Sequence, residues 1–158
     1  MSNPVLSIAP DVPPLQIGML IYPLMTFIDM AGPQSVLGMH GVTHLLWKTL
    51  DPVPTDSAVS VLPTATFAEC PANLDVLFVP GGMGTNAMLQ DVEVLAFLSE
   101  QGKTARYIAS VCSASLILDA AGLLDGYKAA IHSASHETLD EPGVEAVHSC
   151  VVGLAEAA

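Results

Sequence analysis

The chain has 158 residues, which corresponds to one domain at about 100–200 residues per domain. It carries 4 Lys and Arg against 16 Asp and Glu, and the resulting net charge of −12 argues against a nucleic-acid or anionic-membrane partner, because both require clustered cations. Hydrophobic residues make up 51% and charged residues 13%, so the composition excludes a disordered acidic tail and predicts a folded protein with a buried sheet.

The expected elements follow one another in chain order. Residues 1–14 hold four prolines and no hydrophobic period, which predicts a flexible N-terminal tail. After it we expect a buried strand at 15–21, a short helix at 29–38, a strand at 42–48 and a weaker strand or hairpin within 57–67. A buried strand at 73–79, a helix at 92–101, a strand at 107–111 and a helix at 113–121 follow. The last expected elements are short strands at 128–131 and 145–151. Buried strands that alternate with helices predict an α/β fold with a parallel sheet covered on both faces.

The cysteines and the apolar segments bear on the cellular location. Three cysteines at wide spacings (Cys70, Cys112 and Cys150) are not typical of a disulfide framework, and the first Lys or Arg is Lys48, so a signal peptide would lack its basic start. We therefore expect a cytoplasmic protein. The 18 residues 107–124 are apolar enough to suggest a membrane span, but we interpret them as a buried strand followed by a buried helix.

The most informative loop follows the expected strand at 107–111. Active sites of open α/β sheets lie at the carboxyl ends of strands, and this strand ends on Cys112, with a helix starting at once. The small residues Ser110 and Ala114 flank it, as a sharp strand-to-helix turn requires. A helix N-terminus favours the thiolate form of a cysteine, which makes Cys112 a candidate nucleophile. The alternative is a buried core cysteine.

Two further loops are expected at the same edge of the sheet. Gly81 and Gly82 follow the strand at 73–79 and would let backbone N–H groups approach a ligand or a developing oxyanion, although a tight turn alone also explains the pair. The loop lacks the residues of a P-loop or of a dinucleotide fingerprint. Asp29, after the first strand, is either a helix cap or a proton-transfer group, and the second role requires that it meet Cys112 in space.

Other residues with chemical potential carry weaker signals. His132 lies twenty residues after Cys112, and a zinc site is an alternative that no tight ligand motif supports (His132, His136, His148 and Cys150). Cys70 and Cys150 have no helix N-terminus or basic neighbour, so we expect them to be passive. We expect His40 and His44 on the surface or in loops.

Together, these segments resemble the ThiJ/PfpI superfamily, also called DJ-1-like or class I glutamine amidotransferase-like. The resemblance covers roughly residues 15–151 and rests on DMAGP at 29–33, DVLFVPGG at 75–82, RYIASVC at 106–112 and AAGLLDG at 120–126, with His132 at the position of the family histidine. It implies a flavodoxin-like, three-layer α/β sandwich with a mainly parallel sheet, and a homodimer. The family's C-terminal strand, glycine-rich loop and helices are then expected to be missing, which leaves a tail at 1–14, a DJ-1/PfpI-like domain at 15–151 and a short tail at 152–158.

Within the superfamily the chain is similar to the isonitrile (cyclohexyl-isocyanide) hydratases. That branch has Asp rather than Glu after the first strand, as at Asp29, and a hydroxyl residue after the cysteine, here Ser113 in place of Thr. The protease-like branch has His directly after the cysteine instead. The chain departs from the hydratase branch with CSAS at 112–115 where Cys-Thr-Gly-Ala is usual, and with Ser133 where Trp is usual.

This resemblance implies an enzyme that converts a small, apolar isonitrile to an N-substituted formamide without a metal or cofactor. Cys112 would attack the isonitrile carbon to give a thioimidate, and Asp29 would act as acid and then as base. Ser113 would join them in catalysis, while Gly81, Gly82 and His132 would orient the substrate or hold developing charge. Two alternatives stay open, a non-catalytic ligand-binding or cysteine-oxidation sensor and a glyoxalase- or amidase-like enzyme that uses Cys112 with His132.

Overall fold

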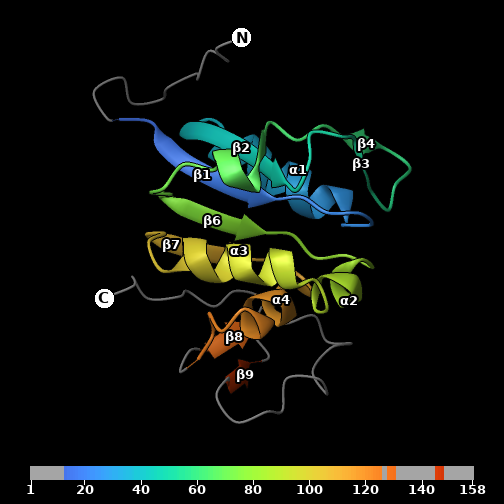
Figure 1. Ribbon diagram of the computed structural model, residues 1–158, viewed down its shortest axis with the longest axis vertical. Helices are drawn as coiled ribbons and strands as arrows, with labels where there is room; N and C mark the ends of the chain where they lie inside the picture. The colour runs from blue at the N-terminus through green and yellow to red at the C-terminus, as the bar shows by residue number, and fades with distance from the viewer. Residues whose placement is uncertain (1–12, 126–127, 131–144, 148–158) are drawn as a thin grey trace.

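A five-stranded sheet, in which every pair of neighbours is parallel, forms the centre of the computed structural model, which describes residues 13–125, 128–130 and 145–147 (Figure 1). The strands lie in the order β5–β2–β1–β6–β7. Their bounds are Leu15–Leu20 for β1, Gly41–Trp47 for β2, Ala65–Thr66 for β5, Val76–Val79 for β6 and Tyr107–Ser110 for β7. This arrangement confirms the expected α/β class with a mainly parallel sheet.

The central strands β1 and β6 lie in the core because they are largely apolar, with Gln16 of β1 the one polar residue in the two strands. Ile17, Met19 and Leu20 of β1 are fully buried, and all four residues of β6 are buried. Side chains alternate between the two faces of a strand, so such a run forms a stable strand only when helices cover both faces. The two strands pair in register, with Ile17 opposite Val76.

Helices cover both faces of this sheet. The longer ones are α1 at Phe27–Leu37, α3 at Val92–Gly102 and α4 at Ala114–Ala120, and the shorter ones are η1 at Phe67–Glu69 and α2 at Thr85–Met88. Right-handed crossovers run from β1 to β2 in one direction and from β6 to β7 in the other, which places α1 and α3 on opposite faces. On the α3 face, the ring of Phe67 stacks on the ring of Phe97 at a centroid distance of 4.1 Å.

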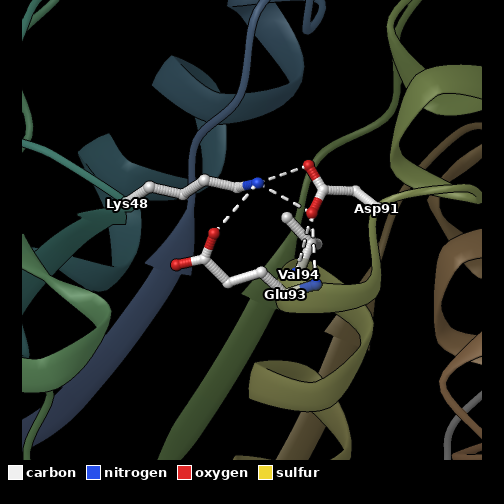
Figure 2. A network of polar contacts seen from close by, with 4 residues as sticks. All are labelled: Lys48, Asp91, Glu93 and Val94. Atoms are coloured by element: carbon white, nitrogen blue, oxygen red, sulfur yellow. Dashed lines mark hydrogen bonds and ion pairs between the residues drawn. The ribbon is translucent and has the colours of Figure 1, made fainter.

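An ion-pair network ties the end of β2 to the start of α3 (Figure 2). The Nζ atom of Lys48 lies 2.7 and 2.6 Å from the two carboxylate oxygens of Asp91 and 3.2 Å from Oε2 of Glu93. Asp91 is also the N-cap of α3, and its side chain accepts hydrogen bonds from the N–H groups of Glu93 and Val94. One carboxylate therefore both caps the helix and holds the loop after β2.

The remaining strands form two small separate sheets. The range 57–67, where a weaker strand or hairpin was expected, holds β4 at Ser60–Val61 and the edge strand β5. β4 pairs antiparallel with β3 at Val53–Pro54, which precedes that range. The expected short strands near 128 and 145 are β8 at Lys128–Ala130 and β9 at Glu145–Val147, which pair in parallel with each other. Within the described part of the chain, no helix is long and apolar enough to cross a membrane, and residues 107–124 contain β7 and α4 as expected.

The order of the strands fixes where a ligand site is expected. The chain moves outward from β1 to β2 and β5 on one side, and outward from β6 to β7 on the other. The loops that follow β1 and β6 therefore diverge at the carboxyl edge, and such a switch point is where open α/β sheets bind ligands. Asp29, at the start of α1, Gly81 and Cys112 come after β1, β6 and β7 in the chain, so all three lie at this edge.

Candidate active site

Cys112 lies on a sharp elbow between β7 and α4. Its φ angle is 58°, in the left-handed region that residues with a Cβ rarely adopt. Hydrogen bonds fix the turn on both sides, from Val111 N–H to the Val79 carbonyl at 3.3 Å and from Ala114 N–H to the Val111 carbonyl at 3.1 Å. The side chain is exposed, so the alternative of a buried core cysteine is wrong. Strained backbone of this kind costs about 1–3 kcal/mol and persists only where the surroundings impose it.

The glycine loop packs directly against this elbow. A Cβ added at Gly81 would lie 2.6 Å from the Cβ of Cys112 and 2.9 Å from the Ser113 nitrogen, so only glycine fits there without displacement. Gly82 has a φ of 145° and forms a β-bridge with Met25, in the segment that leads into α1. The loop after β6 therefore packs between the elbow and the start of α1, the helix that contains Asp29.

Asp29 lies in the first turn of α1, and its position there has two external supports. The helix begins at Phe27, two residues earlier than expected, and its N-cap is Thr26 rather than Asp29. The Thr26 N–H donates to the Gly81 carbonyl at 2.8 Å. The Phe27 N–H donates to Oδ1 of Asp56, on the β3–β4 hairpin, at 3.0 Å. The carboxyl of Asp29 is partly buried, and its Oδ2 atom is shielded from solvent.

A chain of hydroxyl groups runs beneath the elbow. The Tyr22 hydroxyl donates to the Pro80 carbonyl at 2.8 Å and lies 3.4 Å from Oγ1 of Thr85. Thr85 Oγ1 lies 2.8 Å from Oγ of Ser113, which also accepts a hydrogen bond from the Gly82 N–H at 3.2 Å. Ser113 occupies the N-cap position of α4 but makes no side-chain cap bond there. Its hydroxyl instead joins the glycine loop to α2.

The pKa of Tyr22 links the two ionisable candidates, Cys112 and Asp29. Burial above all raises the pKa of Tyr22, the hydrogen bond with Thr85 works in the opposite direction, and negative charges on Cys112 and Asp29 raise it further. Both groups therefore lie within electrostatic reach of the same buried hydroxyl. The arrangement brings an exposed thiol, a carboxyl and a fixed hydroxyl to one edge of the sheet, and covalent catalysis with proton transfer uses groups of these kinds.

Tyr22 and Thr85 were not expected from the sequence. A tyrosine at the end of an apolar strand carries one signal, because a buried phenol needs a hydrogen-bond partner. Thr85 gives no such signal, because a threonine after a glycine loop is an ordinary start of a helical turn. The helix α2 that carries it was not expected either.

Several other sequence expectations can be placed. Cys70 is half-buried, and burial raises its pKa to about 11, in agreement with a passive thiol. His40 is exposed, but His44 was wrongly expected on the surface or in a loop. It lies in β2, with Nε2 hydrogen-bonded to Oε1 of Gln16 at 2.9 Å. Burial lowers the pKa of His44.

The histidines and the cysteine of the zinc alternative lie outside the described residues (His132, His136, His148 and Cys150). Within residues 13–125, 128–130 and 145–147, no group of three His, Cys, Asp or Glu residues is placed to hold a metal ion.

The fold and the elbow define an α/β protein with an exposed cysteine at the carboxyl edge of a parallel sheet. The chain belongs to the DJ-1/PfpI family, whose model matches residues 16–154. It is 43% identical over 140 residues to the isonitrile hydratase of Pseudomonas putida, with 87% of this chain and 61% of the relative covered. It is also 32% identical over 137 residues to the HTH-type transcriptional regulator GbdR of Pseudomonas aeruginosa, with 78% of this chain and 37% of the regulator covered.

Solved structures agree with this assignment. A THiJ/PfpI family protein from Pseudomonas syringae superposes with a TM-score of 0.86 at 44% identity, over 96% of this chain and 64% of that chain. Schizosaccharomyces pombe DJ-1 superposes with a TM-score of 0.75 at 17% identity, over 90% of this chain and 80% of that chain. This likeness shows the shared fold alone. The chain thus spans 61% of the length of the hydratase and 37% of the regulator.

Proposed function

We propose that the protein is an isonitrile hydratase-like enzyme that converts a small apolar isonitrile to an N-substituted formamide. The observation that carries the proposal is the elbow, where Cys112 is exposed at a φ of 58° and packs on Gly81. The carboxyl of Asp29, at the same carboxyl edge of the sheet, interacts electrostatically with the Tyr22 hydroxyl. The 43% identity to the Pseudomonas putida isonitrile hydratase supports this chemistry over others of the family.

The first half of the reaction forms a covalent intermediate. The thiolate of Cys112 attacks the terminal carbon of the isonitrile, so a C–S bond forms and one π bond of the N–C triple bond breaks. The carbon then takes a proton from the carboxylic acid of Asp29. The product is a thioimidate in which the carbon is bonded to sulfur and hydrogen and doubly bonded to nitrogen.

The second half releases the formamide. The Asp29 carboxylate takes a proton from a water molecule as its oxygen adds to the thioimidate carbon, and this proton passes to the nitrogen. Collapse of the tetrahedral intermediate forms the carbonyl and breaks the C–S bond, and the hydroxyl proton returns to Asp29. The thiolate and the carboxylic acid are restored, and one water has been consumed for each isonitrile.

Ser113 carries the hydroxyl that would interact with the charge that develops in these steps. It follows the nucleophile directly, and its oxygen is fixed by the Gly82 N–H and by Thr85. Because the Gly82 N–H already donates to Ser113, Gly82 acts through this serine, while Gly81 provides the space for the elbow. His132 is proposed only as a substrate-orienting residue. We propose that no cofactor is needed and that the enzyme acts as a cytoplasmic homodimer.

The test is formamide production from cyclohexyl isocyanide by the purified protein. Turnover is expected for the wild type and should be lost in Cys112→Ala and Asp29→Asn, whose folding is checked by circular dichroism. Turnover of a small carbonyl compound that survives in Asp29→Asn and is lost in His132→Ala would favour the glyoxalase- or amidase-like alternative, in which Cys112 works with His132.

No turnover from a well-folded wild type would refute the proposal. A non-catalytic ligand or oxidation sensor would then take its place, a role that the exposed thiol and the 32% identity to a transcriptional regulator favour next. Sensor chemistry predicts a stable sulfinic acid at Cys112 after mild peroxide treatment, which mass spectrometry detects.

A further inference from the structure

The hydroxyl chain beneath the elbow has two fixed ends and one reversible link. At one end, the Pro80 carbonyl can only accept, so the single hydroxyl proton of Tyr22 is committed to it. At the other end, the Gly82 N–H can only donate, so Ser113 Oγ always accepts one hydrogen bond. Between them, Thr85 has a single proton and two neighbouring oxygens, those of Ser113 at 2.8 Å and Tyr22 at 3.4 Å.

This proton count allows two arrangements. In the first, Ser113 donates to Thr85 and Thr85 donates to Tyr22, so every proton points inward and the chain ends on Pro80. In the second, Thr85 donates to Ser113, and the Ser113 proton is released to point out of the chain. The two differ only by rotation of two O–H bonds, and no proton leaves its oxygen.

We propose that Thr85 and Tyr22 are positioning residues that let the Ser113 hydroxyl turn its proton toward negative charge forming beside Cys112. When Cys112 carries no charge, as in the thioimidate, the inward arrangement satisfies every hydroxyl. When a thiolate or an anionic substrate atom forms, the outward arrangement presents a donor to it, at no cost in backbone movement. This inference rests on the proposed function, because it assigns the charge to the isonitrile reaction.

Burial supports this role. Tyr22 is fully buried and Thr85 is 4% exposed. A buried hydroxyl is destabilising unless it is hydrogen-bonded, and phenylalanine and valine would fill the same space without that cost. Ionisation of Cys112 or of Asp29 raises the pKa of Tyr22, so the hydroxyl chain lies within electrostatic reach of both groups.

Substitutions at Thr85 test the reversible link. Thr85→Val keeps the shape but removes the proton, and we expect it to lower kcat for cyclohexyl isocyanide roughly threefold to tenfold with KM unchanged, the size of one lost neutral hydrogen bond. The matched variant Thr85→Ser keeps the hydroxyl and should restore kcat to within about twofold of the wild type. An unchanged kcat in Thr85→Val, or equal losses in both variants, would overturn the proposal.

Tyr22→Phe separates positioning from simple structural support. It leaves the Pro80 carbonyl without its donor, so stability should fall. Among the described residues, the Thr85 hydroxyl then keeps its contact with Ser113 alone, so kcat should fall less than in Thr85→Val. The opposite ranking should hold for stability, with Tyr22→Phe the less stable variant in urea. Losses of kcat that merely follow losses of stability would show a structural role and refute the inference.

A readout without turnover keeps the two proposals distinguishable. In a crystal structure of Thr85→Ser, Ser113 Oγ should stay within hydrogen-bond distance of residue 85, whereas in Thr85→Val it should adopt another rotamer. An unmoved Ser113 in Thr85→Val would overturn the positioning role whatever the enzyme does. Absence of wild-type turnover with the expected Ser113 movement would overturn only the proposed function.

Discussion

Replacing Gly81 by alanine tests the packing that holds the nucleophile elbow. A Cβ at position 81 would lie 2.6 Å from the Cβ of Cys112, 2.9 Å from the Ser113 nitrogen and 3.1 Å from the Cys112 sulfur. Carbon atoms pack at about 3.5–4.0 Å, so the elbow would have to retreat by roughly 1 Å. The nearest atoms are a backbone nitrogen and the first carbon of a side chain, so neither can rotate out of the way.

We expect Gly81→Ala to lower the free energy of unfolding by about 1–3 kcal/mol, as overpacking does. If Cys112 is the nucleophile, as proposed, a displacement of about 1 Å should lower turnover by roughly 100-fold. The matched control is Gly32→Ala in α1, where an added Cβ meets nothing within 4 Å. Glycine is unfavourable inside a helix, so this control should gain about 0.5–1 kcal/mol.

Two assays follow the elbow separately from the substrate. Urea denaturation gives the free energy of unfolding of both variants, and iodoacetamide followed by peptide mass spectrometry gives the labelling rate of Cys112. Gly81→Ala should change both quantities, and Gly32→Ala should leave the labelling rate near that of the wild type. If Gly81→Ala matched the wild type in stability and labelling, the glycine loop would not support the elbow and the reasoning would fail.

Three further substitutions or measurements test the supports around the site. Lys48→Met should lower the free energy of unfolding by about 1 kcal/mol at neutral pH. Burial alone would raise the pKa of Asp91, but hydrogen bonds from Lys48 and from backbone N–H groups lower it, so the difference should vanish as the pH falls through that lowered pKa in urea titrations. Asp56→Ala should cost about 0.5–1 kcal/mol by the same measurement, because Oδ1 accepts from the Phe27 N–H at the start of α1. Burial raises the pKa of Cys70 to about 11, so its iodoacetamide labelling should be slow at neutral pH and accelerate as the pH approaches that value.

Controls exist in the same chain for these changes. Lys103 pairs with Glu100 at 2.7 Å on the exposed surface at the end of α3, so Lys103→Met should change stability little. A loss equal to that of Lys48→Met would contradict the role of the partly buried pair of Lys48 with Asp91. Asp56→Asn keeps an acceptor oxygen and should lose less than Asp56→Ala. Rapid labelling of Cys70 in the folded protein at neutral pH would show that its surroundings do not shield it.

The strands and the longer helices could be predicted from the sequence because their apolar patterns are strong. The strand expected at 15–21 is β1 at Leu15–Leu20, and the helix expected at 92–101 is α3 at Val92–Gly102. The start of α1 was placed two residues late for a physical reason. Its first N–H is satisfied by Asp56, a residue from a distant hairpin, and local sequence does not reveal a cap supplied from elsewhere.

The site also contains residues that could be predicted from the sequence and residues that could not. Cys112 could be singled out because small flanking residues and a following helix are local features of an elbow. Tyr22 and Thr85 could not, because their importance comes from contacts between residues 63 positions apart. The α2 turn was missed because four residues are too short for a helical period to show.

Ser113, which follows Cys112, shows that contacts with distant residues can fix a side-chain conformation that the residue type does not fix by itself. The related hydratase branch usually has threonine there, and its branched Cβ restricts χ1, so the hydroxyl direction is partly set by the residue itself. Ser113 lacks that restriction and would rotate freely in isolation. Here the Gly82 N–H and the Thr85 hydroxyl hold its oxygen from two sides, so the direction comes from the glycine loop and α2. A position that looks weakened in the sequence is therefore fixed by tertiary contacts, and its rotation is confined to the O–H bond.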